Sequence, residues 1–177
     1  YIALLVQNEI GWRNLMALSS TAYLATPSGE TPQIDMACLA DHSDGLLALS
    51  GGPHGPLGAL LLDGQSDAAR DLALQFAEIF PGRFYIELMR HGMEEETRIE
   101  PALVDLAYAH DVPLLATNNV YFGPRDKYEA HDALMCIAQS AHIDDRERDR
   151  LTPEHFFRPA EEMRELFADL PEAVENT

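Results

Sequence analysis

The chain has 177 residues, 46% apolar and 24% charged, which suits one soluble domain with a sizeable core. Its formal net charge is −18, and such an acidic surface repels phosphate backbones, so direct binding of nucleic acid by these residues is not expected. The apolar runs are too short for a membrane-spanning helix. Cys38 and Cys136 have neither disulfide nor zinc spacing, so we expect two small buried thiols in a reducing cytoplasm.

Short apolar runs alternate with helical patterns along the chain. Strands are expected at residues 2–6, 45–50, 84–89 and 112–117. Helices are expected at residues 9–24, 34–40, 67–80, 95–110, 126–138 and 159–170, and Pro171 opens a last turn or short helix. This alternation predicts parallel βα units, and therefore an α/β fold with both faces of the sheet covered.

Several segment boundaries depend on proline. Pro101 falls inside the helix expected at residues 95–110, and because proline belongs in a first turn, a start near Glu100 stays open. Thr152-Pro153-Glu154 looks like an N-cap followed by proline at the first helical position. The charged residues 141–149 are expected to form a solvated loop.

Turns that follow strands are the places to look for a site, because ligands of parallel α/β sheets collect at the carboxyl ends of the strands. The candidate turns are residues 7–9, 50–55, 90–92 and 118–121. The glycine-rich residues 50–58 lack the ending of a Walker loop and the GxGxxG spacing, and two prolines remove backbone donors. A structural turn is therefore favoured over a phosphate-binding loop.

The seven histidines occur singly, without HxH, HExxH or HxxxH spacing, so no local metal signature exists. His54 and His91 both follow strand ends. With Glu87 and Asn119 nearby, one weak metal site is an alternative to ordinary loop hydrogen bonding.

Two further charged features favour structural roles. His131-Asp132 lies at the start of an expected helix, where adjacent side chains point about 100° apart, so a helix-surface role is favoured over an oriented catalytic pair. The acidic run at residues 94–96 is expected at a helix N-terminus, where it complements the helix dipole. Taken alone, the residues point to no reaction.

Five blocks in order resemble the PHP (polymerase and histidinol phosphatase) domain of bacterial DNA polymerase III alpha subunits. They are residues 8–15 (NEIGWRNL), 45–55 (GLLALSGGPHG), 80–92 (FPGRFYIELMRHG), 114–122 (LLATNNVYF) and 166–177 (LFADLPEAVENT). The resemblance implies a distorted (β/α)7 barrel, of which residues 1–158 would be a part and residues 159–177 a helical connection toward the polymerase core. The chain opens at Tyr1 within an apolar run, so we expect an internal piece that lacks the family's N-terminal HxH motif.

Metal-binding members of this family hydrolyse phosphoesters in a cleft at the strand ends. Compared position by position, Tyr1 stands where they carry a histidine, Gly52 where they carry a cysteine, and Asn119 and Tyr121 where they carry the Asp and His of TNDVH. Neutral or absent side chains bind Zn²⁺ or Mn²⁺ poorly. The resemblance therefore implies a catalytically silent module with no metal and no cofactor in this segment, and a working metal-dependent phosphoesterase or exonuclease is the alternative.

Silent PHP domains of this family brace the polymerase and dock a separate proofreading exonuclease. The resemblance implies that exonuclease and the rest of the polymerase III holoenzyme as partners. It also implies contact with DNA only through the parent protein, whose Mg²⁺-dependent nucleotidyl transfer uses a palm domain outside these residues. A free-standing PHP-like protein is the second alternative.

Overall fold

The computed structural model describes residues 1–145 and 147–177, so one position of the loop expected at residues 141–149 lies outside the described residues. Its centre is a sheet with the strand order β1-β2-β3-β4. The strands are β1 (Ala3–Val6), β2 (Leu46–Leu49), β3 (Phe84–Met89) and β4 (Leu114–Thr117). β2, β3 and β4 are parallel, which confirms the α/β class. Among the described residues the sheet is open, so a closed barrel stays a prediction.

β1 departs from the expected parallel arrangement, because it pairs with β2 in the antiparallel sense, with Ala3 opposite Leu49. The chain leaves β1 through two helices and re-enters the sheet beside the point where it left. Gln7 N–H donates to Gly45 O at 2.9 Å. A Cβ on Gly11 would lie only 1.9 Å from Gly45 O, so this return depends on two glycines whose backbones touch.

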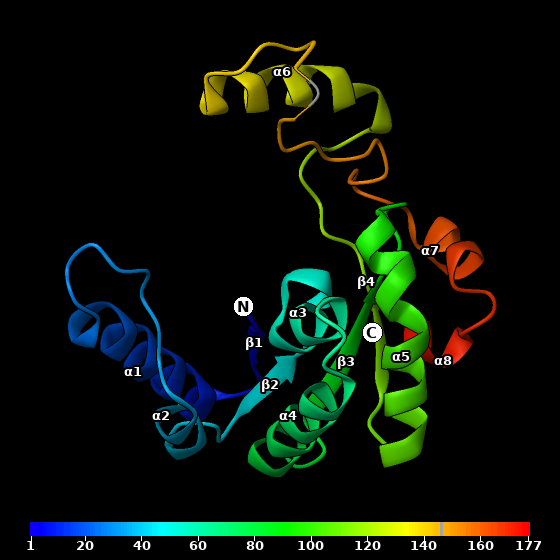
Figure 1. The fold of residues 1–177 in the computed structure, drawn as a ribbon. Helices are drawn as coiled ribbons and strands as arrows, with labels where there is room; N and C mark the ends of the chain where they lie inside the picture. Colours follow the sequence, from blue (N-terminus) through cyan, green and yellow to red (C-terminus); the bar gives the residue numbers. More distant parts are fainter. Residues whose placement is uncertain (146) are drawn as a thin grey trace.

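The described residues form eight α-helices, and α6 (Tyr128–Gln139) is the one that lies apart from the sheet (Figure 1). They are α1 (Glu9–Ala25), α2 (Met36–Asp41), α3 (Pro56–Leu62), α4 (Ser66–Ile79), α5 (Glu94–His110), α6 (Tyr128–Gln139), α7 (Ala160–Leu166) and α8 (Pro171–Glu175). Two 3₁₀ turns, η1 (Gly52–His54) and η2 (Arg125–Lys127), precede α3 and α6. Six helices lie close to their expected positions, α8 forms where a last turn or short helix was expected, and α3 was not expected because glycines and prolines hid its short apolar run.

One alternative boundary is excluded, and one boundary prediction was wrong. α5 begins at Glu94 and carries Pro101 inside it, so a start near Glu100 is excluded, and the missing N–H of Pro101 leaves only one helical hydrogen bond unmade. Residues 153–154 form a turn, and the following helix begins at Ala160 with Pro159 as its N-cap. The Thr152 hydroxyl accepts from Glu154 N at 3.2 Å, a local bond that closes the turn instead of starting a helix.

The core lies between the parallel strands and the helices α3, α4 and α5, which pack against one another beside β3. α8 packs on β4, and Asn176 Nδ2 donates to Leu114 O at 2.8 Å. Fully buried core side chains come from the middle of the chain and from its C-terminal part, and are Leu46, Leu57, Phe80, Ile86, Leu88, Ile99 and Phe167. The expected division at residue 158 stays a prediction.

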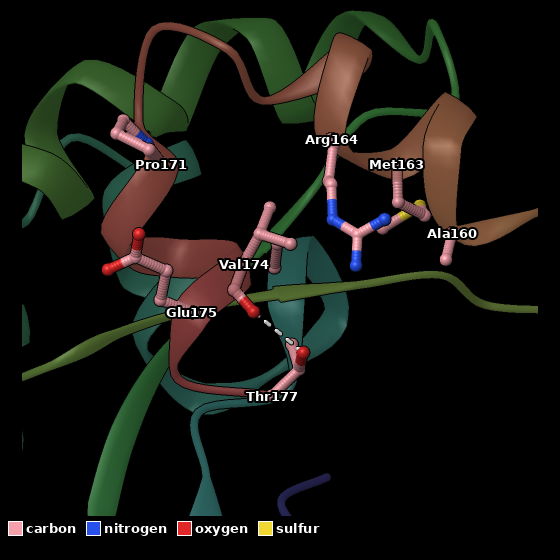
Figure 2. A pocket seen from close by; sticks show the side chains of 8 residues that line it. Ala160, Met163, Arg164, Pro171, Val174, Glu175 and Thr177 are labelled. Atoms are coloured by element: carbon pink, nitrogen blue, oxygen red, sulfur yellow. Dashed lines mark hydrogen bonds between the residues drawn. The ribbon is translucent and has the colours of Figure 1, made fainter.

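A pocket of about 470 Å³ lies where α7 and α8 meet β4 (Figure 2). Apolar side chains make up most of its wall. Its lining residues are Ala116, Ala160, Met163, Arg164, Pro171, Val174, Glu175 and Thr177.

α6 lies apart from the sheet at one end of the molecule (Figure 1). The two segments that lead to it and from it are joined by a parallel bridge between Phe122 and Phe156. Asp132 on α6 is buried and meets Arg148 at 2.6 Å, and the Arg148 side chain is only 2% exposed. The helix-surface role expected for Asp132 was therefore wrong. The solvated loop expected at residues 141–149 is confirmed for most of its described residues, and the buried Arg148 side chain departs from it.

The described residues contain no helix that is both long and apolar enough to cross a membrane. Both cysteines are free thiols. Cys136 is buried as expected, and Cys38 is only partly buried.

Candidate functional site

The site is the edge of the sheet where β2, β3 and β4 end. Because these strands are parallel, the turns that follow them meet at one place. Ser50 and Gly51 follow β2, His91 follows β3, and Asn118 follows β4. Sequence reasoning named four candidate turns, and the structure brings three of them together at this edge.

Glu87 on β3 links the ends of three strands. It is only 5% exposed. Its Oε2 accepts from Gly51 N at 3.0 Å and its Oε1 accepts from the Thr117 hydroxyl at 2.7 Å. Its backbone N donates to Ser50 Oγ at 2.9 Å. The carboxylate is therefore stabilised by internal donors, which gives a buried charge the partners that water would otherwise supply.

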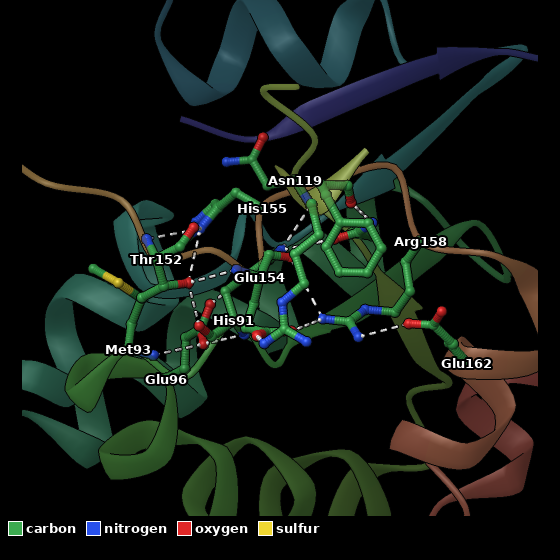
Figure 3. A network of polar contacts seen from close by, with 12 residues as sticks. His91, Met93, Glu96, Asn119, Thr152, Glu154, His155, Arg158 and Glu162 are labelled. Carbon is green, nitrogen blue, oxygen red and sulfur yellow. Dashed lines mark hydrogen bonds and ion pairs between the residues drawn. The ribbon is translucent and has the colours of Figure 1, made fainter. Parts of the chain in front are cut away.

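His91 is buried and tied to the start of α5 (Figure 3). Its ring Nδ1 lies 2.6 Å from Glu96 Oε1, and its backbone N donates to Glu96 Oε2 at 2.6 Å. Glu96 Oε2 also accepts from Met93 N at 3.2 Å and so caps the helix. The placement of the acidic run at a helix N-terminus is confirmed. Its third member also orients a histidine, which sequence reasoning missed.

The second ring nitrogen of His91 faces the end of β4. Nε2 lies 3.0 Å from Asn118 Oδ1 and 3.1 Å from Asn119 N. Asn118 Nδ2 donates to Phe156 O at 2.8 Å, which fixes the orientation of this amide. With Nδ1–H facing Glu96, a neutral ring accepts from Asn119 N–H, whereas a protonated ring donates to Asn118. In both states the two ring nitrogens of His91 are engaged.

His155 stacks on His91, with 4.1 Å between ring centroids and 15° between ring planes. The Thr152 hydroxyl donates to His91 O at 2.5 Å and lies 3.1 Å from His155 Nδ1. Burial, together with the neighbouring His91, lowers the pKa of His155, which favours its neutral form. Sequence reasoning missed Thr152 and His155 because they lie 61 or more residues from His91, and no local pattern indicates the contact.

Two of the four positions compared with metal-binding relatives lie at the β2 turn. Tyr1 is 87% exposed, and its amino group donates to His54 O at 3.3 Å. Gly52 has a φ of +58°, and a Cβ on it would lie 2.9 Å from Met89 Sδ. The space that a ligand side chain at position 52 would need is therefore partly taken by the thioether of Met89.

The other two positions follow β4. Asn119 is exposed, and its backbone N–H, not its side chain, enters the network around His91. Tyr121 is half exposed and lies edge-on to His155 and to His131. In the part of the chain that the structure describes, the side chains of Asn119 and Tyr121 form no hydrogen bond with Glu87 or His91.

The weak metal site considered from the sequence would need His54, His91, Glu87 and Asn119 to converge. His54 is exposed, whereas His91 and Glu87 are buried and already hydrogen-bonded. Across residues 1–145 and 147–177, no group of three or more His, Cys, Asp or Glu side chains is placed to hold a metal ion. The residues at this edge therefore do not fit a PHP-type metal centre.

Beside the network, Arg90 joins the end of β3 to the C-terminal helices. Its guanidinium contacts Glu100 and Asp169 at 2.6 Å each, and it donates to Leu166 O at 2.6 Å. It also lies 4.5 Å above the ring of Phe167. The hydrogen bonds to Asp169 and Glu100 raise the pKa of Arg90, so its charge is permanent. The neighbouring hollow, about 570 Å³ in volume, is lined by Arg90 and Arg158 with their paired carboxylates, which does not favour an anion.

Comparisons with known proteins identify the relatives of this chain. The family model described as "PHP domain" matches residues 1–91. The chain is 51% identical over 176 residues to a DNA polymerase III subunit alpha of Caulobacter vibrioides, covering 99% of the chain and 15% of that relative. It is 38% identical over 178 residues to the protein of the same name from Escherichia coli K12, covering 100% of the chain and 15% of that relative. The chain thus spans about 15% of the length of these curated relatives.

Proposed function

We propose, since this chain belongs to the PHP domain family, that it is the PHP segment of a bacterial DNA polymerase III alpha subunit and serves there as a scaffold without catalysis of its own. The similarity over nearly the whole chain to subunits of that name supports the assignment. The chain would be a small part of the subunit. DNA synthesis, with its Mg²⁺ in a palm domain, would then belong to residues outside it.

The observation that carries the scaffold role is the engagement of the strand-end side chains with one another. In metal-binding relatives such side chains would point at cations. Here the carboxylates of Glu87 and Glu96 accept from protein donors, and both nitrogens of His91 are occupied. Gly52 contributes no side chain at all. An edge built this way suits holding three strands and a helix together. Among the described residues, the side chains of Glu87, Glu96 and His91 are engaged with protein groups and are not free to bind the metal ions that phosphoester hydrolysis would need.

The partners form the second part of the proposal. A silent module of this family would brace the polymerase and dock the proofreading exonuclease of the same holoenzyme, in the cytoplasm. The net charge of −18 supports contact with DNA through the parent protein only.

Metal analysis of the complete protein tests the proposal that the strand-end edge binds no catalytic metal. We expect no Zn²⁺ or Mn²⁺ that depends on these residues, and no phosphoesterase activity that is lost on chelation. The palm domain binds its own ions, so the comparison is made against a Glu87→Gln, His91→Gln variant. A metal content that falls by one or more equivalents in this variant, together with lost phosphoesterase activity, would establish the metal-dependent phosphoesterase instead.

Complex formation tests the partner. The complete protein and the purified exonuclease subunit are mixed and separated by size, with a deletion of the residues that correspond to this chain as the second arm. Co-migration that is lost in the deletion supports docking here. Co-migration that survives the deletion rejects it.

A further inference from the structure

α6 has a buried inner face and an apolar outer face that is exposed. Its inner face carries the buried Asp132 and Cys136. Its outer face carries Leu134 and Ile137, which are 63% and 76% exposed. Exposed alanines extend that outer stripe at positions 130, 133 and 138. A surface helix normally turns a polar or charged face to solvent. The apolar outer face of α6 therefore indicates a surface that another segment covers.

An acidic hollow lies at the C-terminal end of this stripe. It has a volume of about 560 Å³ and is lined by Gln139, Ala141, Asp145, Glu147 and Arg148. Arg148 is already paired with Asp132, and the other charged side chains of the lining, among residues 1–145 and 147–177, are the carboxylates of Asp145 and Glu147. Residues 126–150 carry seven acidic and four basic side chains, a net charge of −3. The complementary occupant has apolar side chains followed by Lys or Arg.

The size of the stripe indicates how the occupant is attached. A helix of 12 residues is about 18 Å long, so one stripe offers on the order of a few hundred Å². Stable complexes between separate proteins bury about 800 Å² on each partner. A patch this small holds its partner only when a covalent link supplies a high effective concentration. The small area argues against a stable dimer held by this face alone.

We infer that the outer face of α6, with the acidic hollow at its end, docks a basic, apolar segment of the same polypeptide that lies outside residues 1–177. The inference rests on the proposed function, because it needs the longer polypeptide that the relatives of this chain have. α6 is then a contact between the PHP module and another part of its own subunit.

Photo-cross-linking tests the inference in the complete protein, purified without other subunits. A benzophenone side chain placed at position 137 is irradiated, and the linked peptides are identified by mass spectrometry. We expect a link within one polypeptide to a segment outside residues 1–177 that combines apolar residues with Lys or Arg. Links only within residues 1–177, links to a second copy, or no link at all would overturn the inference.

Charge variants distinguish specific docking at the acidic hollow from non-specific association. Asp145→Asn with Glu147→Gln should lower the yield of the cross-link severalfold. Glu94→Gln with Glu95→Gln makes the same change in net charge at the exposed start of α5 and should leave the yield unchanged. Equal losses in both pairs would reject the acidic hollow as part of the site. The cross-linking result does not depend on whether the domain binds metal. A metal-binding domain would therefore reject the scaffold proposal without affecting the inference about α6.

Discussion

The imidazole of His91 and the carboxylate of Glu96 meet at 2.6 Å with both side chains almost fully buried. One residue follows β3 and the other lies in the first turn of α5. A single carboxylate therefore fixes the ring of His91, its backbone N–H and the start of the helix. Because His91 also contacts the end of β4, this pair sets the geometry of the whole strand-end edge.

Replacing Glu96 should loosen that edge. Glu96→Ala leaves the His91 ring and two backbone donors without their acceptor, and removing one partner of a buried pair costs about 3–5 kcal/mol. Hydrogen exchange in the complete protein should show this loss as faster opening of the amides at residues 91–97. Glu95→Ala is the matched control, because Glu95 is exposed in the same turn. Equal effects of the two variants would contradict the central role of Glu96.

The pH dependence of the same edge follows from Glu96. Burial raises the pKa of Glu96, but the hydrogen bonds from His91 and Met93 outweigh it, so the net shift is downward from the ordinary value of 4.5. A lowered pKa in the folded state contributes stability that is fully present above 4.5 and is lost as pH falls through the folded-state value. The contribution of Glu96 to the protection of amides 91–97 should therefore be unchanged above pH 4.5. Below pH 4.5 it should decrease as the carboxylate becomes protonated. In a Glu96→Gln variant this acid-dependent step should be absent.

A side chain at position 52 is opposed both by the backbone conformation and by the neighbouring Met89. Comparing alanine substitutions at Gly52 and Gly82 separates the two effects. Gly52→Ala meets both a positive φ of +58° and the sulfur of Met89, whereas Gly82→Ala meets a φ of +66° with nothing within 4 Å. The left-handed conformation costs about 1–2 kcal/mol in each. Local opening measured by hydrogen exchange should show a slightly larger loss for Gly52→Ala, because the flexible Met89 side chain must shift. Equal losses would mean that Met89 moves aside without cost.

Much of this edge could be placed from the sequence, because strand positions are a local signal. β3 begins and ends at the predicted residues, and the rule for parallel strands placed its turn beside those of β2 and β4. The antiparallel β1 was not predictable, since it depends on the contact of Gly11 with Gly45 across two helices. The stack of His155 on His91 joins segments far apart in the chain, and no spacing motif encodes such a contact.

The buried pair of Asp132 and Arg148 should hold the α6 segment together. Hydrogen bonding to Arg148 lowers the pKa of Asp132, so its contribution is present above the ordinary value of 3.8 and is lost as pH falls through the folded-state value. Asp132→Asn should release amides of α6 at neutral pH, because Arg148 loses its carboxylate partner. Asp126→Asn removes an exposed charge from the preceding turn and should change little. An unchanged α6 in the first variant would show that the loop is not anchored by this pair.

Arg90 should anchor the C-terminal helices to the end of β3. Its planar guanidinium meets Glu100, Asp169 and the carbonyl of Leu166 at once, which a lysine ammonium at the same place does not reproduce. Arg90→Lys should therefore weaken the attachment of residues 160–177 by about 1–3 kcal/mol, because the part-buried Glu100 and the Leu166 carbonyl lose donors. The measurement is amide exchange of residues 160–177 in the complete protein. Arg70→Lys on α4 is the control, since the Arg70 pairs with Asp67 and Asp71 are exposed and such pairs contribute under about 1 kcal/mol. If both lysine variants leave residues 160–177 equally protected, the attachment is supplied by the packing of Phe167 and not by the charges of Arg90.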